Sequence, residues 1–270
     1  MRRGFLALLG LLMAACAAHA QPARRVALVI GNSDYPHVPG LKFAGEDASD
    51  MAGALERLGF EVALAVNADL DSMRNSVSAF ARQAGGAEAA LVFYSGHALR
   101  YRGDGYLVPV SATLKDDTSF EWDNLQLQQL TDALARARAS FLIIEGCGSG
   151  RLVSALHRRD GAVIPGLGEV VPRPNMLVAI SSAATGEQCD EPTRNALLTE
   201  SLLAQIEIPG LGAGHVLRRV QQLVALRGAG RQTVEIAGSL PAELAFPRTD
   251  SANAAFRNLG ADPAVVEMRG

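Results

Sequence analysis

The chain has 270 residues, of which 49% are hydrophobic and 20% charged, and this balance allows a globular domain with a substantial core. A net charge of −3 and a pI near 6.0, without a basic stripe interleaved with aromatic residues, argue against a nucleic-acid-binding protein. Beyond the N-terminal segment no apolar run is long enough for a transmembrane helix, which argues against an integral membrane protein.

The first twenty residues have the pattern of a secretory signal peptide. Arg2 and Arg3 form a positive start, residues 5–15 are apolar but too short to span a bilayer comfortably, and residues 18–20 have the small-x-small pattern of a cleavage site. We therefore expect residues 1–20 to be removed and the mature chain to begin at Gln21. This predicts a periplasmic or secreted protein.

The three cysteines leave two questions open. Residues 13–16 resemble a weak lipoprotein box, so cleavage before Cys16 and a lipid anchor there are the alternative to soluble export. After cleavage at residue 20 only Cys147 and Cys189 remain, and they either form a disulfide or stay as free thiols. Neither has the CxxC spacing of a zinc or thioredoxin site, and we predict no metal and no cofactor.

The mature chain alternates short β-branched runs with helical patterns, which is typical of an α/β fold with a largely parallel sheet. In chain order we predict a strand at 25–30, a helix at 41–58, a strand at 61–66, a helix from Asp69 to Gly85, a strand at 89–95, a hairpin at 103–110 turning at 104–105, a helix at 124–137, strands at 141–145 and 175–182, helices at 195–206 and 214–226, and a strand at 233–237. These elements indicate one domain over residues 21–247, with six main strands and helices on both faces of the sheet. The tail, residues 248–270, shows no periodicity.

Residues 146–174 break the alternation of strands and helices. The segment is rich in glycine and proline and carries several arginines, so we predict a long exposed loop. Loops of this length inside a domain are usually functional or disordered.

Two of the predicted strands end in residues that suit nucleophilic catalysis. His97 follows the strand at 89–95, and Cys147 follows the strand at 141–145. If these strands are neighbours in a parallel sheet, both residues emerge at its carboxyl edge, where ligands bind in open α/β sheets. An imidazole there takes the thiol proton and makes the sulfur nucleophilic near neutral pH. A buried thiol and an unrelated histidine remain the alternative.

Four motifs together resemble the caspase-like cysteine peptidases, and in particular the bacterial relatives of metacaspases and paracaspases. The resemblance covers residues 25–240 and rests on VALVIGNSDY at 26–35, LKFAGEDASDM at 41–51, YSGH at 94–97 and EGCGSG at 145–150. The cysteine follows the histidine after about 50 residues, as is usual in caspases. Because several motifs occur in the right order, the resemblance is specific.

This resemblance implies a caspase-like three-layer sandwich and a cysteine endopeptidase with Cys147 as nucleophile and His97 as base. It also implies that the backbone N–H groups of Ala98 and Cys147 bind the oxyanion. The sequence departs from the family at Ala98 (usually glycine), Glu145 (usually aspartate) and Gly148 (histidine in many metacaspases). Both members of the dyad are present, and we expect an active peptidase. The alternative is an inactive caspase-like module that binds peptides or proteins.

Acidic residues near the dyad predict a preference for basic substrates. Glu145 and Cys147 are two apart on a strand and share a face, and the resemblance adds Asp47 to the pocket for the residue before the scissile bond. Two carboxylates in one pocket fit an arginine guanidinium well and a lysine less well. Asp190 is a weaker third candidate. The expected partner is therefore a peptide or protein with a basic residue before the cleaved bond.

Three further expectations concern regulation and alternative functions. Self-cleavage is expected at Arg158, Arg159 or Arg173, because these arginines lie in the predicted loop of an arginine-preferring enzyme. A disulfide between Cys147 and Cys189 would inactivate the enzyme in an oxidising compartment. A flavodoxin-like nucleotide binder is disfavoured, because no glycine-rich phosphate loop opens the first helix.

Overall fold

The structure is a computed structural model that describes residues 24–114, 120–146, 152–153, 163–183, 194–240 and 244–246. A six-stranded sheet runs through it in the order β10-β9-β7-β3-β1-β2. Its strands are β1 (Arg25–Gly31), β2 (Glu61–Val66), β3 (Ala89–Gly96), β7 (Ala139–Gly146), β9 (Met176–Ala183) and β10 (Gln232–Gly238). All neighbouring strands are parallel except β10, which pairs antiparallel with β9. The predicted six-stranded, mostly parallel sheet is confirmed.

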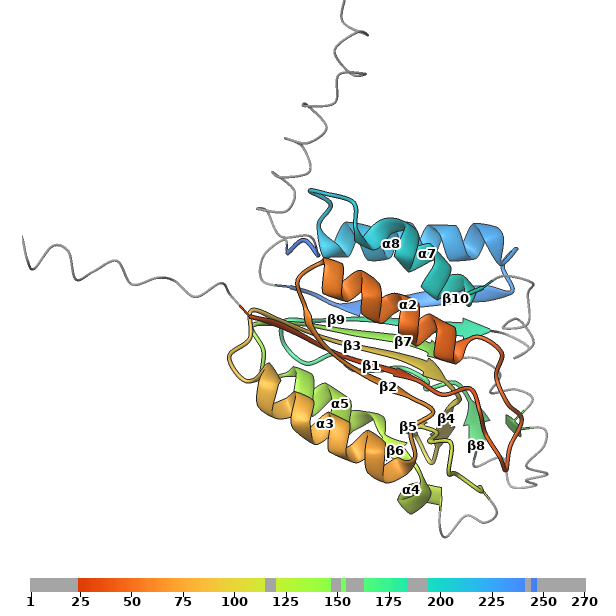
Figure 1. Ribbon diagram of the computed structural model, residues 1–270. Coiled ribbons are helices and arrows are strands. Elements are labelled where there is room, and N and C mark those ends of the chain that lie inside the picture. The colour runs from red at the N-terminus through yellow and green to blue at the C-terminus, as the bar shows by residue number, and fades with distance from the viewer. Residues whose placement is uncertain are drawn as a thin grey trace, which may run out of the picture.

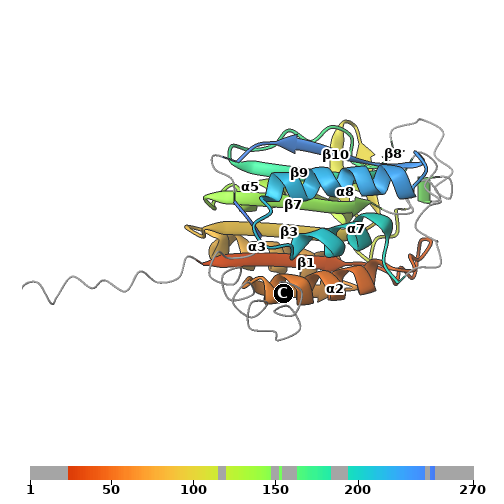
Figure 2. The ribbon, with the colours of Figure 1, turned by 90° about the horizontal axis from the view of Figure 1, so that it is seen from above.

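Helices cover both faces of this sheet and make the fold a three-layer sandwich (Figures 1 and 2). One face carries α2 (Ala44–Arg57), α7 (Leu197–Ile206) and α8 (Ala213–Arg227), and the other carries α3 (Leu70–Ala84) and α5 (Leu127–Leu134). None of the described helices combines the length and apolar character needed to cross a bilayer. The predicted signal peptide and the C-terminal tail, residues 248–270, lie outside the described residues.

Burial on both faces explains why the central strands are almost continuously apolar. In β3, Leu91 and Phe93 point into the core under α2, α7 and α8, whereas Val92 and Tyr94 point into the core over α3 and α5. The same alternation places Ser95, at the end of the strand, on the α2 face. Polar side chains at the carboxyl ends of the strands therefore lie on a defined face of the sheet.

A second, small sheet lies at the carboxyl ends of the central strands and differs from the sequence-based prediction. Its order is β6-β5-β4-β8, formed by β4 (Ala98–Tyr101), β5 (Asp104–Leu107), β6 (Leu125–Gln126) and β8 (Val163–Pro165). The hairpin turns at Arg102 and Gly103, both with positive φ, and not at residues 104–105 as predicted. Asp104 instead pairs with Tyr101 inside the ladder. Residues 146–174 were predicted to be loop throughout, yet β8 pairs with β4 within that range.

The helices match the predicted ones in position; most are shorter than predicted, and α8 extends one residue further at each end. Asp69 is the N-cap of α3, as predicted, and its carboxylate accepts the Ser72 N–H at 2.8 Å. The helix predicted at 124–137 is shorter, because its first residues pair with β5 as strand β6. A one-turn helix, α4 (Phe120–Asp123), was not predicted.

Candidate active site

Pairing of β3 with β7 brings the two motif strands side by side. The strands are parallel neighbours, and Gly96 at the end of β3 faces Gly146 at the end of β7. His97 and Cys147 are the next residues of these two chains. The structure thus confirms that the motif strands are neighbours, while Cys147 itself lies outside the described residues.

The imidazole of His97 is fully buried and is held on several sides. Its Nε2 lies 2.7 Å from the carbonyl oxygen of Pro39. A carbonyl oxygen only accepts hydrogen bonds, so Nε2 carries the proton, and Nδ1 is the basic nitrogen of the neutral ring. This hydrogen bond fixes the tautomer that a base acting through Nδ1 requires.

Two tyrosines hold the backbone of His97. The Tyr35 ring packs against the imidazole with centroids 4.7 Å apart, and its hydroxyl accepts the His97 N–H at 3.2 Å. The Tyr94 hydroxyl donates to the His97 carbonyl oxygen at 2.8 Å. Both hydroxyls also lie 3.2 Å from the carbonyl oxygen of Val108. Burial raises the pKa of both phenols well above the usual range, so they act as neutral donors.

Gly96 makes room for this tyrosine pair. A β-carbon at this position would clash with the Tyr94 hydroxyl and would crowd that of Tyr35. The glycine before the histidine therefore has a packing reason in this chain. Ala98, on the other side of His97, is fully buried, and its methyl group would lie 3.5 Å from a β-carbon at Gly146. The extra carbon at Ala98 is thus accommodated beside a glycine.

The two predicted specificity carboxylates lie together beneath the start of α7. The Asp47 carboxylate accepts the Ser95 hydroxyl at 2.9 Å and the Ala196 N–H at 2.9 Å. The Glu145 carboxylate accepts the Leu198 N–H at 3.0 Å. Both side chains are fully buried, so in this structure they stabilise the first turn of α7, which has no side-chain cap of its own.

Glu145 has two further partners that the sequence did not suggest. Its Oε1 accepts the Ser181 hydroxyl at 2.6 Å and the Gln232 side-chain amide at 3.1 Å. The register explains the first contact, because Ser95, Glu145 and Ser181 face one another across β3, β7 and β9. A buried polar row therefore crosses the sheet on its α2 face.

Burial changes the protonation of this acidic pair. It raises the pKa of Asp47 to about 6, against the opposing effect of its hydrogen bonds. Burial and, second, the negative charge of Asp47 raise the pKa of Glu145 to about 8. At neutral pH Glu145 is therefore largely protonated in this structure, and the pair carries about one negative charge.

A second carboxylate of α2 holds the segment that leads into α7. Asp50 accepts two hydrogen bonds from the Arg194 guanidinium, at 2.8 and 2.9 Å, and one from the Asn195 amide at 3.0 Å. The bidentate Arg194 contact lowers the pKa of Asp50. Because α2 also carries Asp47, this helix anchors residues 194–196 at three points.

Several of the predicted features cannot be placed. Cys189, Asp190, Arg158 and Arg159 lie outside the described residues, so the disulfide, the third acidic candidate and most of the self-cleavage positions stay predictions. Arg173 is described, and its guanidinium donates to Asp132 on α5.

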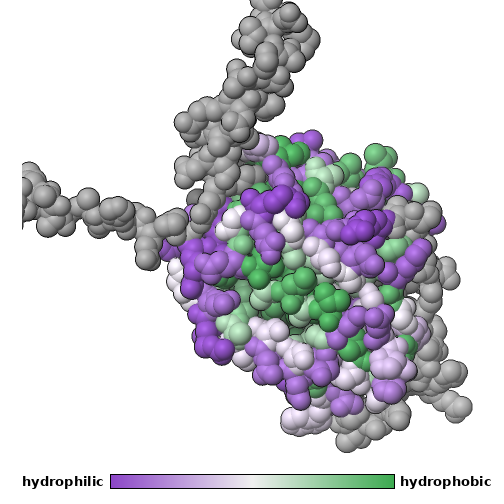
Figure 3. Space-filling model, viewed as in Figure 1, coloured by the Kyte–Doolittle hydropathy of each residue, from purple (hydrophilic) through white to green (hydrophobic). Residues whose placement is uncertain are grey.

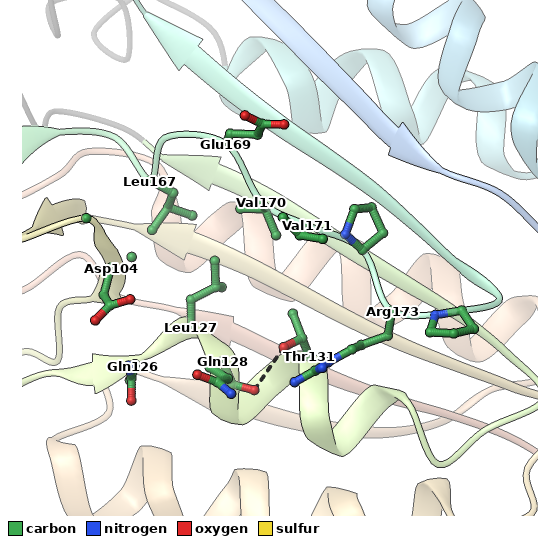
Figure 4. A pocket seen from close by; sticks show the side chains of 14 residues that line it. Asp104, Gln126, Leu127, Gln128, Thr131, Leu167, Glu169, Val170, Val171 and Arg173 are labelled. Carbon is green, nitrogen blue, oxygen red and sulfur yellow. Dashed lines mark hydrogen bonds between the residues drawn. The ribbon is translucent and has the colours of Figure 1, made fainter.

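A hollow of about 450 Å³ lies apart from the residues predicted for catalysis. It is lined by the turn between β4 and β5, by α5 and by residues 167–174 (Figure 4). None of its lining residues is a predicted catalytic or specificity residue. Within the described residues no group of three or more His, Cys, Asp or Glu side chains is arranged to hold a metal ion.

Comparisons with known proteins agree with this architecture. A segment of 88 residues of this chain aligns with the human mucosa-associated lymphoid tissue lymphoma translocation protein 1 at 33% identity. A segment of the same length aligns with the mouse homolog at 32% identity. These alignments cover 33% of this chain and 11% of either relative, so the match spans about a tenth of those proteins. The crystal structure of caspase-1 from Spodoptera frugiperda superposes with a TM-score of 0.59 at 17% identity, covering 85% of this chain and 92% of that one.

The caspase-1 likeness supports the fold alone, since its sequence identity is low. The family model for the caspase domain, in contrast, matches residues 24–245, which is most of the chain. That range contains both motif strands and the acidic pair. The chain therefore belongs to the caspase domain family.

Proposed function

We propose that this protein is a cysteine endopeptidase that cleaves peptide bonds after arginine, and less efficiently after lysine. The observation that carries the proposal is the parallel pairing of β3 and β7, with Gly96 opposite Gly146. His97 and Cys147 follow these residues directly, and Glu145, two residues before Cys147, forms a buried acidic pair with Asp47 of α2.

In the proposed reaction, Nδ1 of His97 takes the proton from the Cys147 thiol, and the sulfur attacks the carbonyl carbon of the scissile bond. The backbone N–H groups of Ala98 and Cys147 bind the resulting oxyanion. The intermediate collapses to a thioester, and the amine leaves with the proton from His97. Water, deprotonated by the same imidazole, then hydrolyses the thioester and restores the thiol.

The acidic pair supports the basic specificity through its charge. Arginine brings five N–H donors in a planar fork that can contact two carboxylates at once, whereas the lysine ammonium is a point charge. A bound guanidinium also favours the ionised form of Glu145, which burial and the charge of Asp47 disfavour in the free protein. Arginine binding should therefore be coupled to proton release from the pair.

The rival function is a non-catalytic module that binds peptides in the same place. The full burial of Asp47 and Glu145 favours it, because both carboxylates already accept backbone N–H groups at the start of α7. Digestion of a mixture of unlabelled peptides, read by mass spectrometry, separates the two. The peptidase produces new C-termini ending in arginine, and the Cys147→Ala variant does not. Peptide binding without new C-termini supports the rival.

Export to the periplasm or beyond is proposed from residues 1–20 only. The mass of the protein recovered from the producing cell tests it. A chain that begins at Gln21 supports soluble export, and a lipidated chain that begins at Cys16 supports an anchor. An intact N-terminus contradicts both.

A further inference from the structure

Strand β2 forms an open, apolar edge of the central sheet. It is the outermost strand on its side, and in the described part of the chain it pairs with β1 alone. Its sequence after Glu61 is entirely apolar, and the side chains of Leu64 and Val66 are 47% and 44% exposed. Hydrophobic surface accordingly occupies the middle of the molecular face on which β2 runs between α2 and α3 (Figures 1 and 3).

Edges of this kind are normally protected. Natural proteins place lysine, proline or bulges on exposed edge strands to prevent pairing with another chain. β2 contains neither lysine nor proline, and its one charge is at its first residue. The opposite edge strand, β10, carries the exposed Glu235 in its middle. The lack of protection at β2 indicates that this edge has a partner.

The sequence of β2 is complementary to itself. Residues 62–66 read Val-Ala-Leu-Ala-Val, which is a palindrome centred on Leu64. In an antiparallel pair related by a two-fold axis at Leu64, every residue faces one of its own kind. Leu64 faces Leu64 of the partner subunit, and Val62 faces Val66 of the partner subunit. A two-fold dimer requires such a self-complementary surface.

The backbone directions are compatible with this axis. The Asn67 N–H donates to the Gly31 carbonyl oxygen at 2.8 Å, so this amide points toward β1. In a planar trans peptide the preceding carbonyl, that of Val66, points the opposite way, to the open edge. By alternation along the strand, the N–H and C=O groups of residues 62, 64 and 66 all point outward.

These outward groups fit an axis through Leu64. Three facing pairs then exchange two backbone hydrogen bonds each, as in the hydrogen-bonded pairs of an antiparallel ladder. An axis through Ala63 or Ala65 would use the same outward groups, because residue 62 would then face residue 64, or residue 64 residue 66, of the other copy. The hydrogen-bonding pattern therefore allows all three axes, and the palindrome is what favours Leu64.

Charges on α3 are also complementary under this axis. The first turn of α3 carries Asp71 and its last turn carries Arg82, whereas on α2 the first turn carries Glu46 but Arg57 in the last turn is already paired with Glu207 at the end of α7. Both helices run antiparallel to β2, and the two-fold axis places the first turn of each beside the last turn of its copy. Acidic and basic ends therefore face each other on the α3 side, and opposite ends of the helix dipoles face each other on both sides of the sheet.

We propose that two copies of this chain associate through antiparallel pairing of β2 with β2 around a two-fold axis at Leu64, which joins the two sheets into one. A single strand edge is small compared with the roughly 1,200–2,000 Å² that stable interfaces bury. The flanking helices must contribute the rest, and the dimer is expected to dissociate on dilution.

Cysteine cross-linking tests the axis directly. In a chain with Cys16→Ala, Cys147→Ala and Cys189→Ala, a Leu64→Cys substitution places two thiols on the axis. Facing residues of a hydrogen-bonded pair have Cα atoms about 5.5 Å apart, within the range of a disulfide. Mild oxidation should therefore give a covalent dimer. A Glu61→Cys substitution on the same strand is the matched control, since its two copies would lie about 20 Å apart and should not cross-link.

Sedimentation at increasing protein concentration tests the association without any cysteine. Leu64→Lys sets two like charges on the axis and should weaken dimerisation at least tenfold, about 1.4 kcal/mol. Glu235→Lys, on the opposite edge strand, should leave it unchanged. Because Leu64 is half exposed, the lysine variant should keep its fold, which its circular dichroism and melting temperature check.

Three results would overturn the proposal. They are a wild-type protein that stays monomeric at all concentrations, equal cross-linking of Leu64→Cys and Glu61→Cys, and a dimer that survives Leu64→Lys. A dimer lost in Glu235→Lys instead would assign the interface to β10. The cross-linking chain lacks Cys147 and is read by mass, so this proposal and the proposed peptidase activity succeed or fail independently.

Discussion

His97, the proposed base, and the acidic pair lie at the same edge of the sheet, but they are held in different ways. His97 is fixed by a carbonyl oxygen and two tyrosine hydroxyls, and these partner groups stay uncharged near neutral pH. Asp47 and Glu145 are fixed by hydrogen bonds to α7, β9 and β10, and they repel each other. The free protein therefore already has the His97 tautomer that the proposed base requires, whereas the acidic pair holds the start of α7.

This difference separates what catalysis and specificity require. The contacts of His97 provide the tautomer that accepts a thiol proton, and no rearrangement of its partners is needed. A substrate guanidinium, in contrast, has to reach carboxylates that are fully buried and already hydrogen-bonded. Changes at the base should affect all substrates alike, and changes at the acidic pair should affect basic substrates and the stability of the fold.

The largest effect is expected from removal of either dyad member. Cys147→Ala and His97→Ala should each abolish turnover of every substrate, because the thiolate forms only when both groups are present. The double variant should be no worse than either single one. Peptide cleavage assays measure this, with His215→Ala, an exposed histidine on α8, as the control. Substantial turnover by either single variant would contradict the mechanism.

Neutralising the acidic pair should have a smaller and selective effect. Asp47→Asn or Glu145→Gln removes one charged acceptor, worth roughly 1.5–3 kcal/mol, so kcat/KM for arginyl substrates should fall at least tenfold. Lysyl substrates should lose less, because an ammonium can move to the remaining carboxylate. Glu145→Asp should be the mildest of these changes, since it keeps the charge.

Glu56→Gln, an exposed carboxylate on the same helix as Asp47, is the control for a general charge effect. Alkylation of Cys147 by an uncharged reagent should be unchanged in all these variants. Wild-type rates on arginyl substrates for both neutral variants would place the specificity elsewhere, with Asp190 as the next candidate.

The buried pair should also make stability depend on pH. A carboxyl whose pKa is raised in the folded state keeps a proton that the unfolded chain has already released. Its contribution is therefore most favourable below about pH 4 and is lost as the pH rises, through about 6 for Asp47 and about 8 for Glu145. We expect the free energy of unfolding to fall over this range by an amount on the order of 1–4 kcal/mol.

Denaturant unfolding from pH 5 to pH 8 measures this slope. In Glu145→Gln the free energy of unfolding should change less between about pH 6 and pH 8 than in the wild type, because the amide does not titrate. Parallel curves for the variant and the wild type would show that Glu145 has an ordinary pKa and is not buried as described.

A few-fold effect is expected from the tyrosine beside the base. Tyr35→Phe removes the hydroxyl that accepts the His97 N–H but keeps the ring. A lost hydrogen bond of about 0.5–1.5 kcal/mol corresponds to a kcat roughly two- to thirteenfold lower. Arginyl and lysyl substrates should lose activity equally, unlike in the acidic variants. Tyr106→Phe, another buried tyrosine, is the control. A loss confined to arginyl substrates in Tyr35→Phe would contradict the expectation that changes near His97 affect all substrates alike.

The sequence predicts the order of elements well, because burial on both faces makes each central strand an apolar run. It also places His97 and Cys147 directly after two of these strands, and the structure shows that the two strands are neighbours. It misses β8, whose three residues lie in a glycine- and proline-rich segment and form a strand only by pairing with β4. Pairing between distant segments has no local pattern that a single sequence reveals.

The partners of the candidate site were missed for the same reason. Pro39 acts through its backbone carbonyl, which every residue has, and Gln232 reaches Glu145 from a strand 87 residues later. Tyr35 belongs to a motif that was read as part of the resemblance, but its contact with His97 depends on tertiary packing. The palindrome in β2 is visible in the sequence, and only the sheet order shows that this strand lies at an edge.

The central claim is that Cys147, activated by His97, attacks a carbonyl group presented by an arginyl substrate. An irreversible peptidyl-arginyl electrophile, followed by intact mass and peptide mapping, tests it most directly. The account predicts one added label on Cys147 in the wild-type protein, much less label in His97→Ala, and none in Cys147→Ala. An unlabelled wild-type protein, or equal labelling of the wild type and His97→Ala, would contradict it.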